Sequence, residues 1–247
     1  MMYLYIALLS VFALFLSGCS QDKKQDEIHF ATFAEYPPFE YYQRGEIKGF
    51  DIDLAKLVAS ELGKTAVFDN MQFSTILPSI ISGKVDAAIA TITITSERQK
   101  NFDFTIPYYF SGMAVLYKTK EPINNIAELK VKKIGAQIGS VMEIWLRKHF
   151  RTGEISTLNT NNQALEALIA GHVDAVLVDG AQASVYSKKH PGISNTLITK
   201  ADSGYGIALK KGSPLTTQMN QALKKLKADG HLEKLKAKWF GGVSWKP

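Results

Sequence analysis

Two polar residues stand where a ligand could bind. Thr91 and Asp179 each end a continuous apolar run that predicts a buried strand, over residues 85–91 and 173–179. In open α/β sheets, ligands bind at the carboxyl ends of the strands. A hydroxyl and a carboxylate at such ends suit hydrogen bonding and ion pairing with a polar ligand. If the two strand ends face each other, the ligand lies in a cleft between two lobes.

The two strands belong to similar stretches of sequence. Residues 80–91 read IISGKVDAAIAT and residues 168–179 read LIAGHVDAVLVD. Both patterns predict the end of a helix, a glycine cap and a buried strand. Because the similarity is short, chance resemblance of two helix–strand units stays an alternative to a repeat.

Helices and strands alternate around these units, which is typical of an α/β fold with a largely parallel sheet. In the first helix, Asp51 or Asp53 is expected to cap the N-terminus. The extended run 108–118 and the return near 199–204 predict two crossing strands, which form a natural hinge. Strands are expected over 28–33, 66–69, 85–91, 134–138 and 204–209, and helices over 51–62, 74–82, 139–150, 214–228 and 231–239.

Composition excludes several classes of function. The chain has 247 residues, 46% hydrophobic and 21% charged, which suits one large globular domain or two small ones. A net charge of +6 is too mild to indicate nucleic-acid binding by itself. One cysteine allows neither an intramolecular disulfide nor a cysteine-based metal cluster, and the five histidines lack metal-ligand spacing. The sequence also contains no nucleophile elbow and no phosphate loop. Taken together, these features lead us to expect no cofactor, no metal and no nucleic-acid partner.

A solvated helix face is predicted for the C-terminal lysines Lys224, Lys225, Lys227, Lys234, Lys236 and Lys238.

The N-terminus predicts export. Residues 1–18 carry no charged side chain, and their apolar run 5–16 is too short to span a membrane but suits a signal-peptide core. The run ends in LSGC at 16–19, which resembles the lipobox of bacterial lipoproteins although no Lys or Arg precedes it. The resemblance implies a signal peptide over 1–18, lipid on Cys19 and a tether over 19–27. A cysteine buried in a first strand is the alternative, and the polar residues 20–27 disfavour it.

Five stretches carry a wider resemblance: YPPFE at 36–40, GFDIDL at 49–54, Phe73 with LPS at 77–79, TITITSER at 91–98 and FTIPYY at 104–109. Together they resemble the periplasmic binding components of polar amino-acid ABC importers over residues 28–240. The resemblance implies a two-lobed periplasmic-binding-protein fold joined by two crossover strands, with one lobe at 28–110 and 204–242 and the other at 111–203. It also implies a monomeric, lipid-anchored protein of the cell envelope that passes a free L-amino acid to an ABC permease and its ATPase.

The resemblance assigns roles that the chemistry of an amino acid explains. Arg98 would clamp the carboxylate, because a guanidinium matches it with two parallel hydrogen bonds. Asp179 would take the ammonium with help from Thr91, while Tyr36 and Phe73 enclose the side chain. Further contacts are expected at Ala90, Thr93, Phe33, Gln137, Ser140 and Val141, in part through backbone amides. Arg98 could instead lie on the surface, Asp179 could cap a helix, and the two aromatic residues could be plain core.

The sequence is ambiguous about which amino acid is bound. Arginine and lysine binders of this family often carry an acid at the positions of Phe33 or Thr93, and this chain has neither. Residues 90–95 resemble the glutamine-binding branch, whereas 36–40 resemble the arginine-binding branch. An aromatic box of Phe33, Tyr36 and Phe73 could hold a guanidinium by cation–π contact. We therefore expect a polar or basic L-amino acid, arginine first and glutamine second.

Two other functions use the same fold. A receptor or adhesin would bind an amino acid and signal to another partner, and the sequence leaves this open. A dehydratase-type enzyme would need an acid or base in the cleft beyond Asp179. Because Phe33 and Thr93 do not supply one, the chain is not predicted to be an enzyme.

Overall fold

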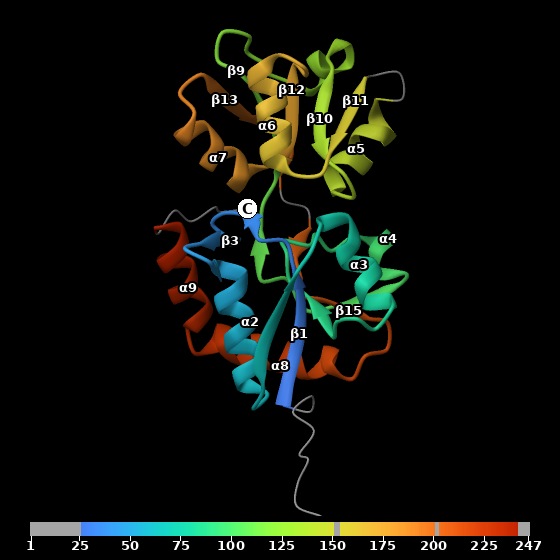
Figure 1. Cartoon of the computed structure of the whole chain (residues 1–247), viewed down its shortest axis with the longest axis vertical. Helices are drawn as coiled ribbons and strands as arrows, with labels where there is room; N and C mark the ends of the chain where they lie inside the picture. The colour runs from blue at the N-terminus through green and yellow to red at the C-terminus, as the bar shows by residue number, and fades with distance from the viewer. Residues whose placement is uncertain (1–25, 151–153, 201–202, 242–247) are drawn as a thin grey trace, which may run out of the picture.

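The structure is a computed structural model that describes residues 26–150, 154–200 and 203–241. It consists of two α/β lobes placed end to end (Figure 1), each built on a five-stranded sheet. The two-lobed α/β fold expected from the sequence is therefore confirmed.

The first lobe has the strand order β5-β1-β6-β15-β7. β1, β5 and β6 run parallel, and β15 lies antiparallel between β6 and β7. The strands are β1 (Glu27–Thr32), β5 (Thr65–Asn70), β6 (Ala87–Ala88), β7 (Phe102–Phe104) and β15 (Ala208–Lys210). A small antiparallel sheet of β2 (Glu35–Tyr36), β3 (Glu40–Gln43) and β4 (Glu46–Lys48) adjoins this lobe.

Helices cover both faces of the first sheet (Figure 1). One face packs on α2 (Phe50–Glu61), α8 (Leu215–Ala228) and α9 (His231–Phe240). The other face packs on α3 (Phe73–Ile81), and α4 (Ser96–Gln99) precedes β7. Because both faces are buried, β6 and the two residues after it, 87–90, read as a continuous apolar run rather than as an alternating one.

The second lobe has the order β11-β10-β12-β9-β13. β10, β11 and β12 are parallel, and β9 pairs antiparallel with β12 and β13. The strands are β9 (Met113–Lys118), β10 (Ile134–Gln137), β11 (Ile155–Leu158), β12 (Ala175–Asp179) and β13 (Ile193–Leu197). One face packs on α6 (Asn161–Ala170) and α7 (Gly180–Lys189), and the other on η3 (Ile126–Val131) and α5 (Val141–His149).

The chain passes between the lobes at β8 (Tyr109–Phe110) and β14 (Gly204–Tyr205), which pair antiparallel. Beyond this pair the two crossing segments stay in contact, because the Met113 amide donates to Thr199 Oγ1 at 3.1 Å. β9 belongs to the second sheet, so the crossing is shorter than the expected hinge over 108–118. The lobe boundaries at 110/111 and 203/204 fall within this crossing and stay a prediction.

Two details of the first lobe correct the expected elements. The strand expected over 85–91 is limited to β6, and Thr91 beyond it adopts a left-handed backbone conformation with φ 49°. The helix cap at Asp51 or Asp53 is wrong, since Gly49 occupies the N-cap position of α2 and no side chain caps it. A Cβ on Gly49 would lie 1.9 Å from the Phe39 carbonyl oxygen, so only glycine fits there.

The expectations for the signal peptide 1–18 and for Cys19 lie outside the described residues. Of the expected tether 19–27, the last residue already belongs to β1. Among the helices of the described ranges, none combines the length and apolar character needed to cross a membrane. The described residues also contain no group of three His, Cys, Asp or Glu side chains that could hold a metal ion.

Candidate functional site

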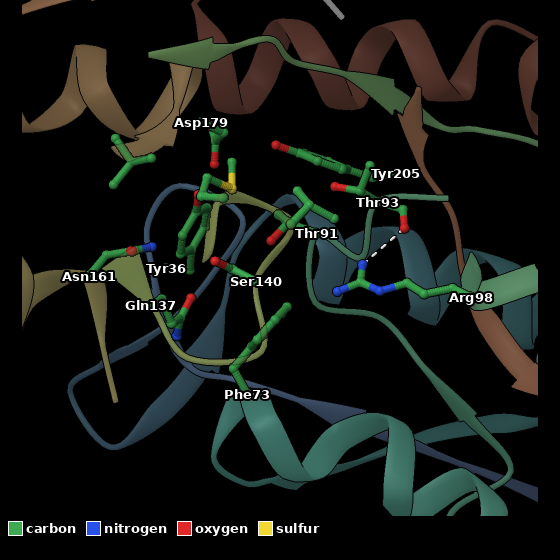
Figure 2. Close-up of a pocket in the computed structure, with 13 residues that line it drawn as sticks. Tyr36, Phe73, Thr91, Thr93, Arg98, Gln137, Ser140, Asn161, Asp179 and Tyr205 are labelled. Atoms are coloured by element: carbon green, nitrogen blue, oxygen red, sulfur yellow. Dashed lines mark hydrogen bonds between the residues drawn. The ribbon is translucent and has the colours of Figure 1, made fainter. Parts of the chain in front are cut away.

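A cleft lies between the two lobes (Figure 2). Both lobes contribute to its wall, mostly from the ends of strands and the helix starts that follow them. The sequence-predicted residues that line it are Tyr36, Phe73, Thr91, Thr93, Arg98, Gln137, Ser140, Val141 and Asp179. Thr91 and Asp179 therefore face a common space, as the sequence suggested, although β6 ends before Thr91.

Two of the expected contacts, Phe33 and Ala90, are not among the residues that line the cleft. Both are buried in the core of the first lobe, at 3% and 0% exposure. The ring of Phe33 packs edge-on against Phe73 with 6.3 Å between centroids. Phe33 thus supports the cleft wall from behind, and the expected aromatic box reduces to Tyr36 and Phe73.

Four lining residues were missed by sequence reasoning: Met142, Asn161, Val178 and Tyr205. Met142 and Val178 are chain neighbours of predicted residues, so adjacency was an available signal. Asn161 begins α6 directly after its capping Thr160, a helix start that follows a parallel strand as Val141 does. Tyr205 arrives on β14 from the far end of the chain, and only its flanking glycines marked it.

Arg98 is about nine-tenths buried, so its reading as a surface arginine is wrong. The short helix α4 carries it, with Thr95 as the capping residue. Its Nη1 donates to the Thr93 carbonyl at 2.9 Å, and its Nη2 donates to the Gly139 carbonyl of the second lobe at 3.1 Å. Burial lowers the pKa of Arg98 to about 10, so the guanidinium stays cationic at neutral pH.

Asp179 combines both roles that the sequence left open. It ends β12 and caps α7, since the Gln182 amide donates to its Oδ1 at 3.0 Å. The Ser111 hydroxyl donates to the same oxygen at 3.2 Å. Burial raises the pKa of Asp179 to about 6, opposed by hydrogen bonds from Gln182, Ala181 and Tyr205. The carboxylate is therefore anionic at neutral pH and lies in the cleft wall.

Thr91 and Thr93 contribute both backbone and side-chain atoms to the wall of the cleft. The Thr91 hydroxyl donates to the Ala90 carbonyl at 2.8 Å, which leaves its oxygen free to accept. Thr93 offers its carbonyl to Arg98 and forms a bridge with Tyr205. These contacts fix the lobe-one side of the cleft through the backbone.

The second lobe brings the N-terminus of α5 to the cleft. Ser140 caps this helix, accepting from the Glu143 amide at 3.2 Å, and Val141 is its first residue. Unpaired amides and the dipole at a helix start favour an anionic group. Gln137 ends β10 beside them, and its Nε2 donates to the Asn159 carbonyl at 3.1 Å.

Two opposite charges define what the cleft can hold. In Figure 2, Asp179 and Arg98 lie apart, with Thr91 between them in this view. Among the described lining residues they are the only carboxylate and the only cation. A guanidinium recognises a carboxylate, and a buried carboxylate recognises an ammonium. The arrangement suits a small zwitterion whose remaining part meets Tyr36 and Phe73.

Comparisons with known proteins agree with this geometry. Residues 28–242 match the family model described as bacterial extracellular solute-binding proteins, family 3. The arginine-binding extracellular protein ArtP of Bacillus subtilis is 32% identical over 231 residues, which cover 92% of this chain and 90% of that protein. The solved structure of an ancestral arginine-binding protein bound to arginine has a TM-score of 0.84 at 38% identity, covering 87% of this chain and 98% of that one. A second structure of an ancestral arginine-binding protein, bound to glutamine, gives the same values.

Proposed function

The chain belongs to the bacterial extracellular solute-binding proteins, family 3, and we propose that it captures a free polar or basic L-amino acid and delivers it to an ABC importer. Arginine is the first choice of ligand and glutamine the second. The observation that carries this proposal is the pair of buried, opposite charges, Arg98 and Asp179, in one cleft between two lobes. Relatives named as arginine-binding support the order of ligands.

Capture proceeds by closure of the lobes. The ligand docks first on lobe one, where its α-carboxylate accepts from Arg98. Two of the five guanidinium N–H groups bond to Thr93 and Gly139, so others remain for the ligand. Closure then adds Asp179 for the ammonium and the amides at the start of α5. The closed form is the one that a permease would recognise.

Charge pairing explains the expected selectivity for free amino acids. A buried charge without its partner costs several kcal/mol, because desolvation is no longer offset. A ligand that lacks either the carboxylate or the ammonium would leave Arg98 or Asp179 in that condition. Such ligands are therefore rejected through unpaired charge rather than through shape.

The side-chain end of the ligand would meet Tyr36, Phe73 and the amides of Gln137 and Asn161. A guanidinium over aromatic faces gains about 2 kcal/mol when desolvated, which suits arginine. Side-chain amides both donate and accept, which suits glutamine. An acidic ligand would find no second cation among the described lining residues.

We also propose that lipid on Cys19 anchors the protein in the cell envelope, where it serves an ABC permease and its ATPase. The lipobox-like LSGC at 16–19 supports the anchor. Substitution Cys19→Ser should move the protein from the membrane fraction to the soluble fraction. Retention of this variant on the membrane would contradict lipid anchoring and leave ligand capture unaffected.

A thermal-shift screen of the purified protein against the twenty L-amino acids tests ligand capture. At 100 times the dissociation constant, a ligand adds about 2.7 kcal/mol of stability. For a chain of this size that corresponds to a rise in Tm of roughly 5–10 °C. We expect this rise with arginine or glutamine. A rise with acidic amino acids only, or with none, would overturn the proposal.

Arg98→Ala should abolish the ligand-induced rise, because it removes the carboxylate clamp. Arg147→Ala is the matched control, since Arg147 lies on α5, is exposed and pairs with Glu143. We expect the ligand-free Tm of Arg98→Ala to stay within roughly 4 °C of the wild type, the effect of about 1 kcal/mol. A much larger fall would identify Arg98 as structural rather than ligand-binding.

A receptor would pass the same screen, so uptake separates the two functions. Cells that lack this protein should lose high-affinity uptake of the labelled amino acid identified by the screen. Unchanged uptake would favour the receptor.

A further inference from the structure

Thr91 has an unusual backbone for its residue type. Its φ of 49° lies in the left-handed region, where a β-branched side chain is crowded. Arg44 is the other described non-glycine residue with positive φ, and it lies exposed in the turn between β3 and β4. Thr91, by contrast, lines the cleft. Strain of this kind persists only where surrounding contacts enforce it, and it is often found at functional sites.

A contact on the Thr91 backbone comes from Asp51 in the first turn of α2. The Thr91 amide donates to Asp51 Oδ2 at 2.9 Å, and the Tyr108 hydroxyl donates to the same oxygen at 2.8 Å. Asp51 is fully buried and is not among the residues that line the cleft. Its own amide donates to the Phe39 carbonyl at 2.9 Å, so its backbone is fixed as well.

The carboxyl group of Glu40 interacts with that of Asp51. Glu40 is 1% exposed, and no N–H or hydroxyl of the described chain reaches Asp51 Oδ1 or either oxygen of Glu40. A proton shared between the two carboxyl groups would pair Asp51 Oδ1 with one oxygen of Glu40. Burial, with the charge of Asp51, raises the pKa of Glu40 well above its usual value, so Glu40 holds that proton. Asp51 is thereby held from both sides.

We propose that Asp51, backed by Glu40, is a positioning residue that holds Thr91 in its left-handed conformation and so sets the affinity of the cleft for its ligand. The inference rests on the proposed function, in which Thr91 contacts the amino acid. A charge-assisted hydrogen bond donated by the Thr91 amide to a fully buried carboxylate is strong enough for this task. The GFDIDL stretch thus contributes to binding without touching the ligand.

The test is a double-mutant cycle on the full chain, with L-arginine and L-glutamine titrated by calorimetry. Asp51→Ala removes the acceptor and should weaken binding on the order of 10-fold. Asp51→Asn keeps an acceptor oxygen and should stay within about 3-fold of the wild type. In a Thr91→Gly background, Asp51→Ala should cost less than about 3-fold, because glycine adopts positive φ unaided.

Asp53→Ala is the matched control. Asp53 follows Asp51 by two residues in the same helix. Its carboxylate accepts hydrogen bonds from the side chains of Lys238 and Trp239. An equal loss in Asp51→Ala and Asp53→Ala would overturn the proposal, as would a loss that persists in the Thr91→Gly background. If Asp51→Ala does not fold, Asp51→Ser takes its place, since its shorter side chain also cannot reach Thr91.

A second readout needs no ligand. Hydrogen exchange of the Thr91 amide, followed by NMR, should be slow in the wild type, faster in Asp51→Ala and slow again in Asp51→Asn. Equal exchange in all three would overturn the positioning role. If the wild type bound neither amino acid, the proposed function would fail, and this exchange measurement would still decide whether Asp51 holds Thr91.

Discussion

At the scale of single residues, burial sets the chemistry of Asp179. A carboxyl in water ionises near pH 4, whereas burial raises the pKa of Asp179 to about 6. Only the ionised form can pair with an ammonium. The charge needed for ligand binding therefore appears within the range from pH 5 to pH 7.

Ligand affinity should fall as pH is lowered through about 6. Below this pKa, each pH unit costs about a factor of ten, so binding at pH 5 should be about 10-fold weaker than at pH 7.5. Calorimetry in buffers of different ionisation enthalpy should also detect proton release on binding near pH 6. Burial holds the pKa of Asp51 at about 6 as well, so Asp51→Asn is the control. Loss of the pH dependence in that variant would assign it to Asp51 instead of Asp179.

At the scale of elements, the strand-to-helix junction β12–α7 places Asp179. The residue that ends the strand is also the N-cap of the helix, with φ −76° and ψ 158°. A side-chain oxygen at the N-cap position accepts a hydrogen bond from an amide of the first helical turn. The backbone of the N-cap residue is extended, as the preceding strand requires. The same residue can serve the helix and the cleft because the cap uses Oδ1.

Asp179→Asn and Asp179→Ala should separate these two roles. Asparagine keeps the capping oxygen, so the ligand-free Tm at pH 7.5 should equal or exceed that of the wild type. A higher Tm follows from the raised pKa of Asp179, since the buried charge lowers the stability of the wild type above pH 6. Alanine removes the cap at a cost of about 1 kcal/mol, a fall in Tm of roughly 2–4 °C. Both variants should lose the thermal shift with ligand, and retention of the shift in Asp179→Asn would exclude an ion pair with the ammonium.

At the scale of the whole molecule, the loop before α5 brings the lobes into contact. Gly139 accepts from Arg98 of the first lobe, and a Cβ added to it would lie 3.3 Å from Ser74 Cα at the start of α3. Its φ of 78° also favours glycine. The described arrangement therefore depends on a small residue where the lobes meet.

Gly139→Ala should oppose closure. Small-angle scattering of the ligand-saturated protein should show a larger radius of gyration than the wild type, and ligand affinity should fall by a factor of about 3 to 10. Gly83→Ala is the control, because Gly83 has φ 72° and nothing within 4 Å of its Cβ position. It shares the backbone strain without the contact between lobes. Identical scattering from Gly139→Ala and Gly83→Ala would show that this contact does not govern closure.

The sequence by itself determined the two-lobed α/β fold and most of the cleft lining. Buried strands read as continuous apolar runs, and polar residues at their ends stand out against them. The ordered stretches around Tyr36, Phe73 and Arg98 carried the resemblance to a family of binding proteins. These signals are local, because helix periodicity, glycine caps and short motifs each lie within a few neighbouring residues.

Only the tertiary structure decided which side chains reach the cleft and what holds them. Phe33 and Ala90 are near neighbours of lining residues, yet their side chains belong to the core behind the wall. Tyr205 reaches the cleft from a strand more than a hundred residues beyond Thr91. Asp51 reads in sequence as a helix cap, and a contact across 40 residues makes it the partner of Thr91 instead. Such pairings depend on how the elements pack around both sheets, and spacing along the chain does not encode them.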